Sequence, residues 1–188
     1  MHPIKYVWAL RAIVYKPFFK NIGSMTYIGK PCFIEGRSGI SIGERTRIFP
    51  GVRMEAIENG TISIGDDCAI EQNVHIISKG NNLQIGNNTT ISANVFISNV
   101  DHDYRDITKS VMNQPLLEKD TKIGVSCFIG FGATILPGTS IGNHCIIGSN
   151  AVVKGKYQDY CVIAGAPAKI IKIYQEDLGK WRNINDNQ

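Results

Sequence analysis

The sequence predicts an all-β protein, a three-sided parallel β-helix built from hexapeptide repeats, with short N- and C-terminal helical caps. An aliphatic residue recurs every six positions from Ile22 onward, usually followed by Gly or another small or polar residue. The 188 residues include 19 glycines, while aromatic residues make up only 9%. Repeats of this period indicate a solenoid, and the composition suits tight corners around a core of small aliphatic side chains.

The N-terminal segment, residues 1–21, is expected to be an amphipathic cap helix. Residues 3–20 combine apolar side chains with scattered lysines and an arginine, and they contain no acidic residue. Two interpretations of residues 1–20 remain open: a cap over the open end of the solenoid, or peripheral docking on an anionic membrane surface. Arg11 interrupts the apolar run and no small-residue cleavage site follows, so we expect neither a signal peptide nor a membrane span.

Residues 22–168 are expected to form the β-helix domain. Three repeats suit one coil of three short strands and three corners. The aliphatic residue of each repeat is expected to point inward and to stack on its copies at the ~4.8 Å spacing of neighbouring strands. The expected inward positions are Ile22, Ile28, Ile34, Ile42, Ile48, Met54, Ile64, Ile70, Ile76, Ile85, Ile91, Ile97, Ile123, Ile129, Ile135, Ile141, Ile147 and Val153.

The small residue four positions after each aliphatic one is expected to point inward as well. Four of the five cysteines fall in this column (Cys32, Cys68, Cys127 and Cys145), which predicts buried packing residues. An odd number of cysteines without CxxC spacing predicts neither a disulfide framework nor a zinc framework, and a reducing, cytoplasmic setting fits best. The rest of the column is Thr46, Val52, Val74, Thr89, Val95, Ala133, Thr139 and Ala151.

Interruptions of the period all follow the third repeat of a coil, so we expect every insertion to leave the solenoid at one corner. The longest is an excursion loop over residues 98–122. Insertions in solenoids gather on one edge that is often the binding face, so this loop is the first place to expect chemistry. Residues 169–188 are expected to form a C-terminal capping helix or tail.

The repeats, together with the closing Gly165–Lys169 turn, resemble the left-handed β-helix acyltransferases of the hexapeptide-repeat superfamily. Within it, the run Ile97–His102 before a long loop resembles the sugar and polysaccharide O-acetyltransferases. The resemblance covers about residues 22–172. It implies the left-handed sense of the helix, acetyl-CoA as the acetyl donor, a homotrimer, and an active site at the subunit boundary.

His102 matches the family's catalytic position, where the repeat gives way to the excursion. Transfer of an acetyl group from a thioester to a hydroxyl needs a base near neutral pKa and a donor for the oxyanion. We expect His102 to be the general base of a direct transfer, and the resemblance implies oxyanion support from a backbone N–H near Phe131. The acidic residue that orients this base in some relatives has no clear match; Gln114 and Glu118 lie nearest its place.

The resemblance also implies two sets of binding residues, one for the acceptor and one for the donor. For both sets, a purely structural interpretation as corner residues or solvated surface residues stays open. Glycines would allow the pantetheine arm of the donor to approach the backbone, and lysines would face its phosphates. The acceptor set is Glu71, Asn73, Asp101 and Tyr104. The donor set is Phe128 (where relatives often carry Trp), Gly130, Phe131, Gly132, Ala133, Gly148, Ser149, Lys169 and Lys172.

Two further classes of site are not expected. His75 and His144 are expected to be surface residues, and no close His pair is present, which a zinc carbonic anhydrase of this architecture would require; no metal site is therefore expected. The net charge of +4 is spread along the chain without a basic and aromatic patch, so no nucleic-acid partner is expected.

The acceptor is a glycan if the resemblance holds. The segment His102–Asp106 is similar in sequence to enzymes that acetylate bacterial surface polysaccharides. This similarity predicts a role in polysaccharide or lipopolysaccharide biosynthesis, in which the enzyme would acetylate the glycan or its lipid-linked precursor. Two other functions stay open: N-acetylation of a nucleotide-linked amino sugar, and a non-catalytic β-helix scaffold.

Overall fold

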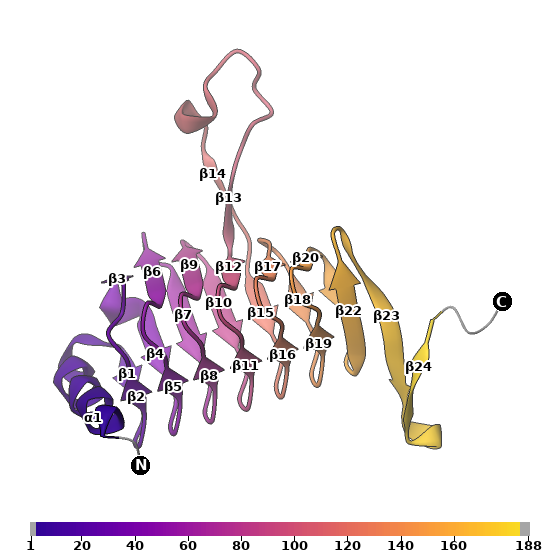
Figure 1. The fold of residues 1–188 in the computed structure, drawn as a ribbon. Coiled ribbons are helices and arrows are strands. Elements are labelled where there is room, and N and C mark those ends of the chain that lie inside the picture. Colours follow the sequence, from indigo (N-terminus) through magenta and orange to yellow (C-terminus); the bar gives the residue numbers. More distant parts are fainter. Residues whose placement is uncertain (1–2, 185–188) are drawn as a thin grey trace.

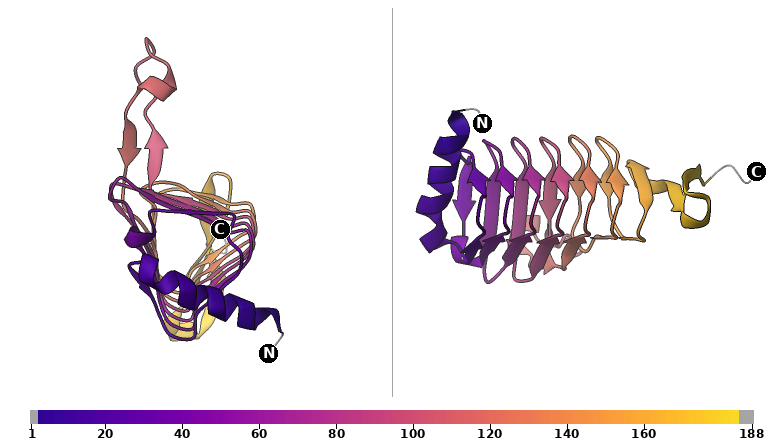
Figure 2. Two further views of the ribbon diagram at one scale, coloured as in Figure 1. Left: turned by 90° about the vertical axis from the view of Figure 1, so that its left-hand side faces the viewer. Right: turned by 90° about the horizontal axis from the view of Figure 1, so that it is seen from below.

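The computed structural model describes residues 3–184, and over this range the chain forms a three-sided solenoid of short parallel strands (Figure 1). Viewed along its axis, successive coils superpose as a triangle (Figure 2). One helix crosses the N-terminal end, one hairpin projects from an edge, and two further strands with antiparallel pairing follow the last coil. The predicted three-sided parallel β-helix is confirmed.

Each side of the solenoid is one sheet whose parallel strands come from successive coils. Face A holds β1 (Asn21–Ile22), β4 (Ile40–Ile42), β7 (Thr61–Ile64), β10 (Asn82–Ile85), β15 (Thr121–Ile123), β18 (Ser140–Ile141) and β21 (Lys156–Tyr157). Face B holds β2 (Tyr27–Ile28), β5 (Arg47–Ile48), β8 (Ala69–Ile70), β11 (Thr90–Ile91), β16 (Phe128–Ile129), β19 (Ile146–Ile147) and β22 (Cys161–Gly165). Face C holds β3 (Phe33–Glu35), β6 (Arg53–Ile57), β9 (His75–Lys79), β12 (Phe96–Ser98), β17 (Thr134–Ile135) and β20 (Val152–Val153).

The core is the stack of aliphatic residues that the repeat predicts. On face A, for example, Ile42 pairs in register with Ile64, Ile64 with Ile85, and Ile85 with Ile123. All four are buried. Full burial of one isoleucine contributes roughly 1.5–3 kcal/mol, so the inward row supplies most of the cohesion between coils.

The column of small residues is buried too, with one correction. Thr46, Cys68, Thr89, Cys127 and Cys145 are buried, and the Thr46 hydroxyl both donates to the Gly65 carbonyl and accepts from the Cys68 N–H. A small side chain is therefore needed at each corner, where it stacks on the corner of the next coil.

Cys32 is exposed, so its predicted burial is wrong. It lies in the first coil, where no preceding coil covers its corner, and α1 packs against β2 instead. Cys161, which the repeat did not assign to the column, is buried and continues it, since β19 pairs with β22 in register.

Insertions leave at the corner between faces C and A (the CA corner), as predicted. The 3₁₀ turn η2 (Arg37–Gly39) and the short turns at residues 58–60 and 80–81 lie there. The long excursion rises from the same corner as a hairpin of β13 (Val100–His102) and β14 (Leu116–Glu118), with η3 (Val111–Asn113) near its tip (Figure 1).

The N-terminal helix is confirmed. Helix α1 (Ile4–Tyr15) and the turn η1 (Lys16–Phe18) lie across the open end of the first coil (Figure 2). Trp8 meets Phe49 edge-on at 5.6 Å, and Arg11 Nη1 donates to the Ile28 carbonyl at 2.8 Å. None of the helices in the described part of the chain is long and apolar enough to span a membrane.

The predicted C-terminal helix is wrong. The chain reverses after β22 and forms β23 (Ala168–Gln175) antiparallel to it, then η4 (Glu176–Leu178) and β24 (Lys180–Asn183). Ile170, Ile171 and Ile173 favour a strand, and the open edge of β22 offers them backbone partners. Residues 185–188 of the predicted cap lie outside the described part.

Candidate active site

His102 ends β13, on the arm of the hairpin that leaves the solenoid. Its backbone N–H donates to Asp101 Oδ1 at 2.9 Å, and its Cα partner across the hairpin is Leu116. The imidazole is exposed, and it makes no hydrogen bond with any side chain or carbonyl in residues 3–184. An imidazole placed this way has both ring nitrogens available to a ligand.

A pocket of about 310 Å³ lies between the hairpin and face C, and His102 is part of its wall. The floor comes from the outward row of face C and the wall from the hairpin base. The lining is mostly apolar: Ile57, His75, Ile77, Phe96, Ser98, Val100, Asp101, His102, Leu116, Leu136 and Pro137. Such a pocket suits an acceptor with one apolar side and a hydroxyl turned to the imidazole.

His75, expected on the surface, is half-buried in the floor of this pocket. Its Nε2 lies 2.7 Å from Glu55 Oε1, and its ring meets Phe96 edge-on at 5.2 Å. Glu55 is itself buried and accepts from Arg53 Nε and Nη2 at 2.6 and 2.9 Å. The Arg53 guanidinium, and then His75, hold the pKa of Glu55 below its ordinary value.

The base of the hairpin is fixed to the preceding coils. Asn99 is fully buried, with its Nδ2 donating to Ser78 Oγ at 2.9 Å and its Oδ1 accepting from the Lys79 N–H at 2.8 Å. Lys79 Nζ also pairs with Glu118 at 2.7 Å. The position of His102 relative to face C is therefore set by buried contacts.

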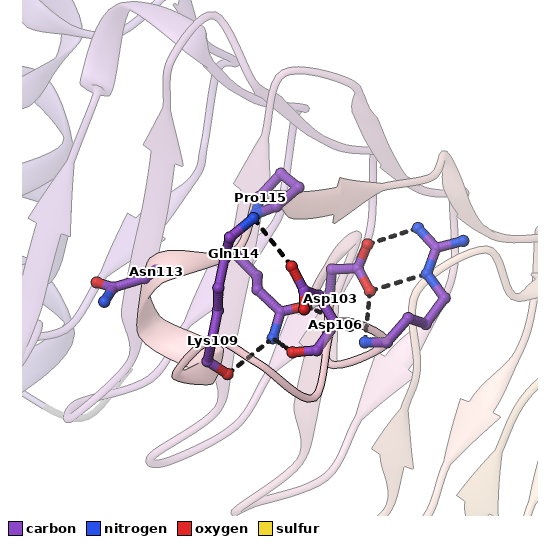
Figure 3. A pocket seen from close by; sticks show the side chains of 7 residues that line it. Asp103, Asp106, Lys109, Asn113, Gln114 and Pro115 are labelled. Atoms are coloured by element: carbon purple, nitrogen blue, oxygen red, sulfur yellow. Dashed lines mark hydrogen bonds and ion pairs between the residues drawn. The ribbon is translucent and has the colours of Figure 1, made fainter.

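The outer part of the excursion is held by its own polar groups (Figure 3). The buried Asp103 carboxylate accepts from Arg105 Nε and Nη2, which keeps its pKa well below the ordinary value. Gln114 accepts from the Asp106 N–H at 3.0 Å and donates to the Asp106 carbonyl at 2.9 Å. Gln114 and Glu118 thus stabilise the hairpin, and neither forms a hydrogen bond with the His102 ring among residues 3–184.

The predicted acceptor residues fall into two groups. Asp101 lines the pocket beside His102, and Tyr104, 70% exposed, stands on the loop just beyond it. Glu71 and Asn73 lie at the corner between faces B and C (the BC corner), where Glu71 Oε2 accepts from the Ala93 N–H and Asn73 Nδ2 donates to Asn94. The structure does not bring this second pair into the pocket of the same chain.

The predicted donor residues gather along the later coils, away from the pocket. The BC corner carries Gly130, Phe131, Gly132 and Ala133 between β16 and β17, and Gly148 and Ser149 between β19 and β20. Phe128 is exposed on face B, and Lys169 and Lys172 are exposed on β23. None of these residues lines the pocket that contains His102.

Two features of the BC corner suit a bound thioester. Gly132 has φ +68°, a backbone conformation that Asn94 and Asn150 also adopt at this corner of the neighbouring coils, and because it has no side chain a ligand can approach its backbone closely. The N–H of Phe131, half-exposed, has no hydrogen-bond partner in residues 3–184 and remains available to an oxyanion.

Over the same range, no group of three or more His, Cys, Asp or Glu side chains is placed to hold a metal ion.

The chain is similar to several known proteins. Residues 120–155 match the family "Bacterial transferase hexapeptide (six repeats)". WbbJ of Escherichia coli (strain K12), named for O-acetyl transfer in lipopolysaccharide biosynthesis, is 34% identical over 173 residues, which cover 87% of this chain and 85% of that protein. Rv3034c of Mycobacterium tuberculosis, named as an acetyltransferase, is 30% identical over 90% of this chain and 56% of its own length.

Among solved structures, the N-acyltransferase AntD from Bacillus cereus, in complex with dTDP and 3-hydroxybutyryl-CoA, superposes with a TM-score of 0.77. The match covers 89% of this chain and 90% of AntD at 20% sequence identity, a likeness of fold.

Proposed function

This chain belongs to the bacterial hexapeptide-repeat acetyltransferases, an acyltransferase family, and from that membership we propose that it moves an acetyl group from acetyl-CoA to a hydroxyl group of a sugar. The observation that carries the proposal is the position of His102. Its imidazole is exposed, makes no hydrogen bond with another group of residues 3–184, and lines a pocket of about 310 Å³ beside a hairpin that is fixed to the preceding coils.

The chemistry follows from that position. His102 takes the proton of the acceptor hydroxyl, and the oxygen attacks the thioester carbonyl carbon to form a tetrahedral oxyanion. The Phe131 N–H would stabilise this oxyanion. When the C–S bond breaks, the CoA thiolate leaves and takes the proton back from the imidazolium, so that acetylated sugar and CoA-SH are the products.

We propose further that the enzyme is a homotrimer whose active site is shared by two chains. In one chain, His102 lies at the CA corner and the donor residues at the BC corner, on opposite edges of face C. A five-residue strand such as β9 spans about 16 Å between these edges. A reaction between groups so far apart needs a second chain that brings its BC corner to the first chain's hairpin.

The acceptor we propose is a bacterial surface polysaccharide, such as lipopolysaccharide, or its lipid-linked precursor, acetylated in the cytoplasm where acetyl-CoA is made. The support is the 34% identity to WbbJ along most of both chains. The fold likeness to AntD favours one alternative, N-acylation of a nucleotide-linked amino sugar.

The proposal is tested by replacing His102. The variant His102→Ala should lose about 10²–10⁴-fold in turnover, the usual contribution of a general base. CoA binding, measured by calorimetry, and the oligomeric state should stay unchanged. The matched control is His144→Ala, because His144 is an exposed imidazole stacked on Tyr160. Retained turnover in His102→Ala would refute the assignment.

A second measurement separates the candidate functions. Thiol release from acetyl-CoA should be seen with a purified glycan acceptor and should be absent with a nucleotide-linked amino sugar. Release with the amino sugar alone would favour the N-acyltransferase alternative, and no release with either acceptor would favour a scaffold.

A further inference from the structure

Helix α1 is apolar on two opposite sides, and capping the solenoid uses only one of them. Its inner side packs on the solenoid: Trp8 meets Phe49 of the second coil, Ala12 is buried, Tyr15 stacks on Phe19 just after the helix, and the helix contacts β2 of the first coil. The outer side carries five exposed apolar residues, Tyr6 (66% exposed), Val7 (54%), Leu10 (61%), Ile13 (68%) and Val14 (56%).

The outer side has no role in a simple cap. Terminal elements of solenoids usually turn a polar face to solvent, and a helix that is apolar all round is normally covered on all sides. The exposed apolar surface also continues beyond the helix, to Phe18 (59% exposed) and to Met25 (68%), which lines one shallow pocket together with Ile13. We call this surface, Tyr6–Val14 of the outer side with Phe18 and Met25, the apolar end.

The charges of residues 3–34, the segment that carries the apolar end, are all of one sign, while the exposed Glu44 of the next coil lies beside the Ser24–Met25 corner and pairs with Arg45. Before Glu35 the chain contains no Asp or Glu. It contains five basic residues there, of which none forms an ion pair in the described part of the chain. These are Lys5, Arg11, Lys16, Lys20 and Lys30. Apolar side chains flanked by unpaired cations match the interface of an anionic lipid surface.

The geometry lets these residues reach a flat surface at once. Helix α1 lies across the end of the solenoid, roughly perpendicular to its long axis (Figure 2). We therefore infer that the apolar end docks the protein on an anionic membrane surface, with the solenoid standing away from the lipid. In a trimer with parallel axes, three such helices would lie in one plane, which strengthens binding by multivalency.

Docking in this orientation also sets where the acceptor must be, a consequence that rests on the proposed function. β12, which leads into the hairpin, follows β3, β6 and β9 on face C, three coil spacings from the end. At ~4.8 Å per spacing and a helix diameter of about 10 Å, His102 stands about 25 Å above the lipid. A glycan attached to a membrane carrier would reach it several sugar units out from the carrier.

The test is vesicle flotation of the full chain. With vesicles of about one-third phosphatidylglycerol in phosphatidylcholine, the protein should float at low ionic strength and less at high ionic strength. With pure phosphatidylcholine it should remain in the dense fraction. The double variant Leu10→Glu/Ile13→Glu, changed only on the exposed side of α1, should lose at least about tenfold in partitioning.

Leu178→Glu is the matched control, because Leu178 is 52% exposed in η4 at the other end of the solenoid, and its partitioning should equal that of the wild type. Equal partitioning of wild type and the double variant would overturn the inference. A drop in the sedimenting mass of the double variant would also overturn it, since the apolar end would then be an interface between copies. Acetyl transfer to a water-soluble acceptor should be unchanged in the double variant, so failure to dock and failure of the proposed function are told apart.

Discussion

Glu55 is a buried carboxylate that links two coils next to the pocket. Arg53, two residues away on β6, donates from Nε to Glu55 Oε1 and from Nη2 to Glu55 Oε2. His75 of the next coil forms a hydrogen bond with Oε1 as well. Because its Nε2 is engaged, His75 presents a fixed ring face and edge to the pocket floor. We expect His75 to position the acceptor, while His102 performs the proton transfer.

The variant Glu55→Gln should lower the free energy of unfolding at pH 7 by about 1–3 kcal/mol, because Arg53 and His75 lose a charged acceptor. The pKa of Glu55 is lowered in the folded protein, so this stabilisation is fully present above the ordinary glutamate range and is lost as the pH falls through the lowered pKa. Urea unfolding at neutral and acidic pH should therefore show a difference from wild type that shrinks in acid.

Glu35→Gln is the control for this measurement. Glu35 is the in-register neighbour of Glu55 on β3, but it is exposed. Its substitution should leave the unfolding curve unchanged at both pH values. An equal effect of the two substitutions would contradict the role given to the buried carboxylate.

Among single residues, the sequence predicted His102 and Asp101 as site residues because the repeat breaks at the start of the excursion, and both line the pocket, while their roles stay predictions. It missed His75 and Glu55. Their contact depends on the register between β6 and β9, and those strands belong to coils whose turns at the CA corner differ in length. From the repeat alone, an outward-pointing residue is predicted to be solvent-exposed, because the sequence does not show that a neighbouring insertion covers it.

The short strands of the solenoid were predictable because a single inward residue defines each one. The same rule failed where the repeat stops: β23 carries no hexapeptide pattern, and its partner is the preceding strand in reverse. The rule also failed at Cys32, since periodicity cannot tell an end coil from an inner one.

The cysteine column makes an experimental prediction. Under native conditions a thiol reagent should react rapidly with Cys32 alone, because Cys68, Cys127, Cys145 and Cys161 are buried. Burial also raises the pKa of the Cys68 thiol, which reduces its thiolate fraction. In denaturant all five thiols should react. The variant Cys32→Ser should lose the rapid phase entirely, whereas a second rapid thiol in the native protein would contradict the continuous column.

In the whole molecule, the proposed catalytic base and the proposed donor corner are separated by face C. If two chains share each site, inactive variants with lesions in different halves should complement one another. We choose His102→Ala for the base and Ser149→Trp for the donor corner, where an exposed serine leaves room for the larger side chain without disturbing the core.

Each variant alone should be inactive, while co-expression in equal amounts should restore about a quarter of wild-type turnover, because a quarter of the interfaces pair an intact His102 with an intact donor corner. The measurement is CoA release from purified mixed trimers, confirmed by mass. Complete absence of recovery in verified mixed trimers would contradict a shared site.

Little about the assembly of whole molecules could be predicted from the sequence. The repeat predicted the solenoid, since every coil obeys the same inward pattern. Contacts between chains do not appear in the repeat, so the predictions of a trimer and of a glycan acceptor depended on likeness to relatives. The inner and outer sides of α1 could be distinguished only from its packing on the solenoid.

The reversal of the chain after β22 has a consequence for behaviour at high concentration. A stack of parallel strands ends in unpaired backbone groups, which invite another molecule to add on and grow a fibre. Here β23 and β24 add two antiparallel strands to the last strand of face B, so that this sheet ends in the four-residue strand β24, and faces A and C end in the two-residue strands β21 and β20. Such short edge strands offer an incoming chain few backbone groups with which to pair, which opposes fibre growth from this end of the solenoid.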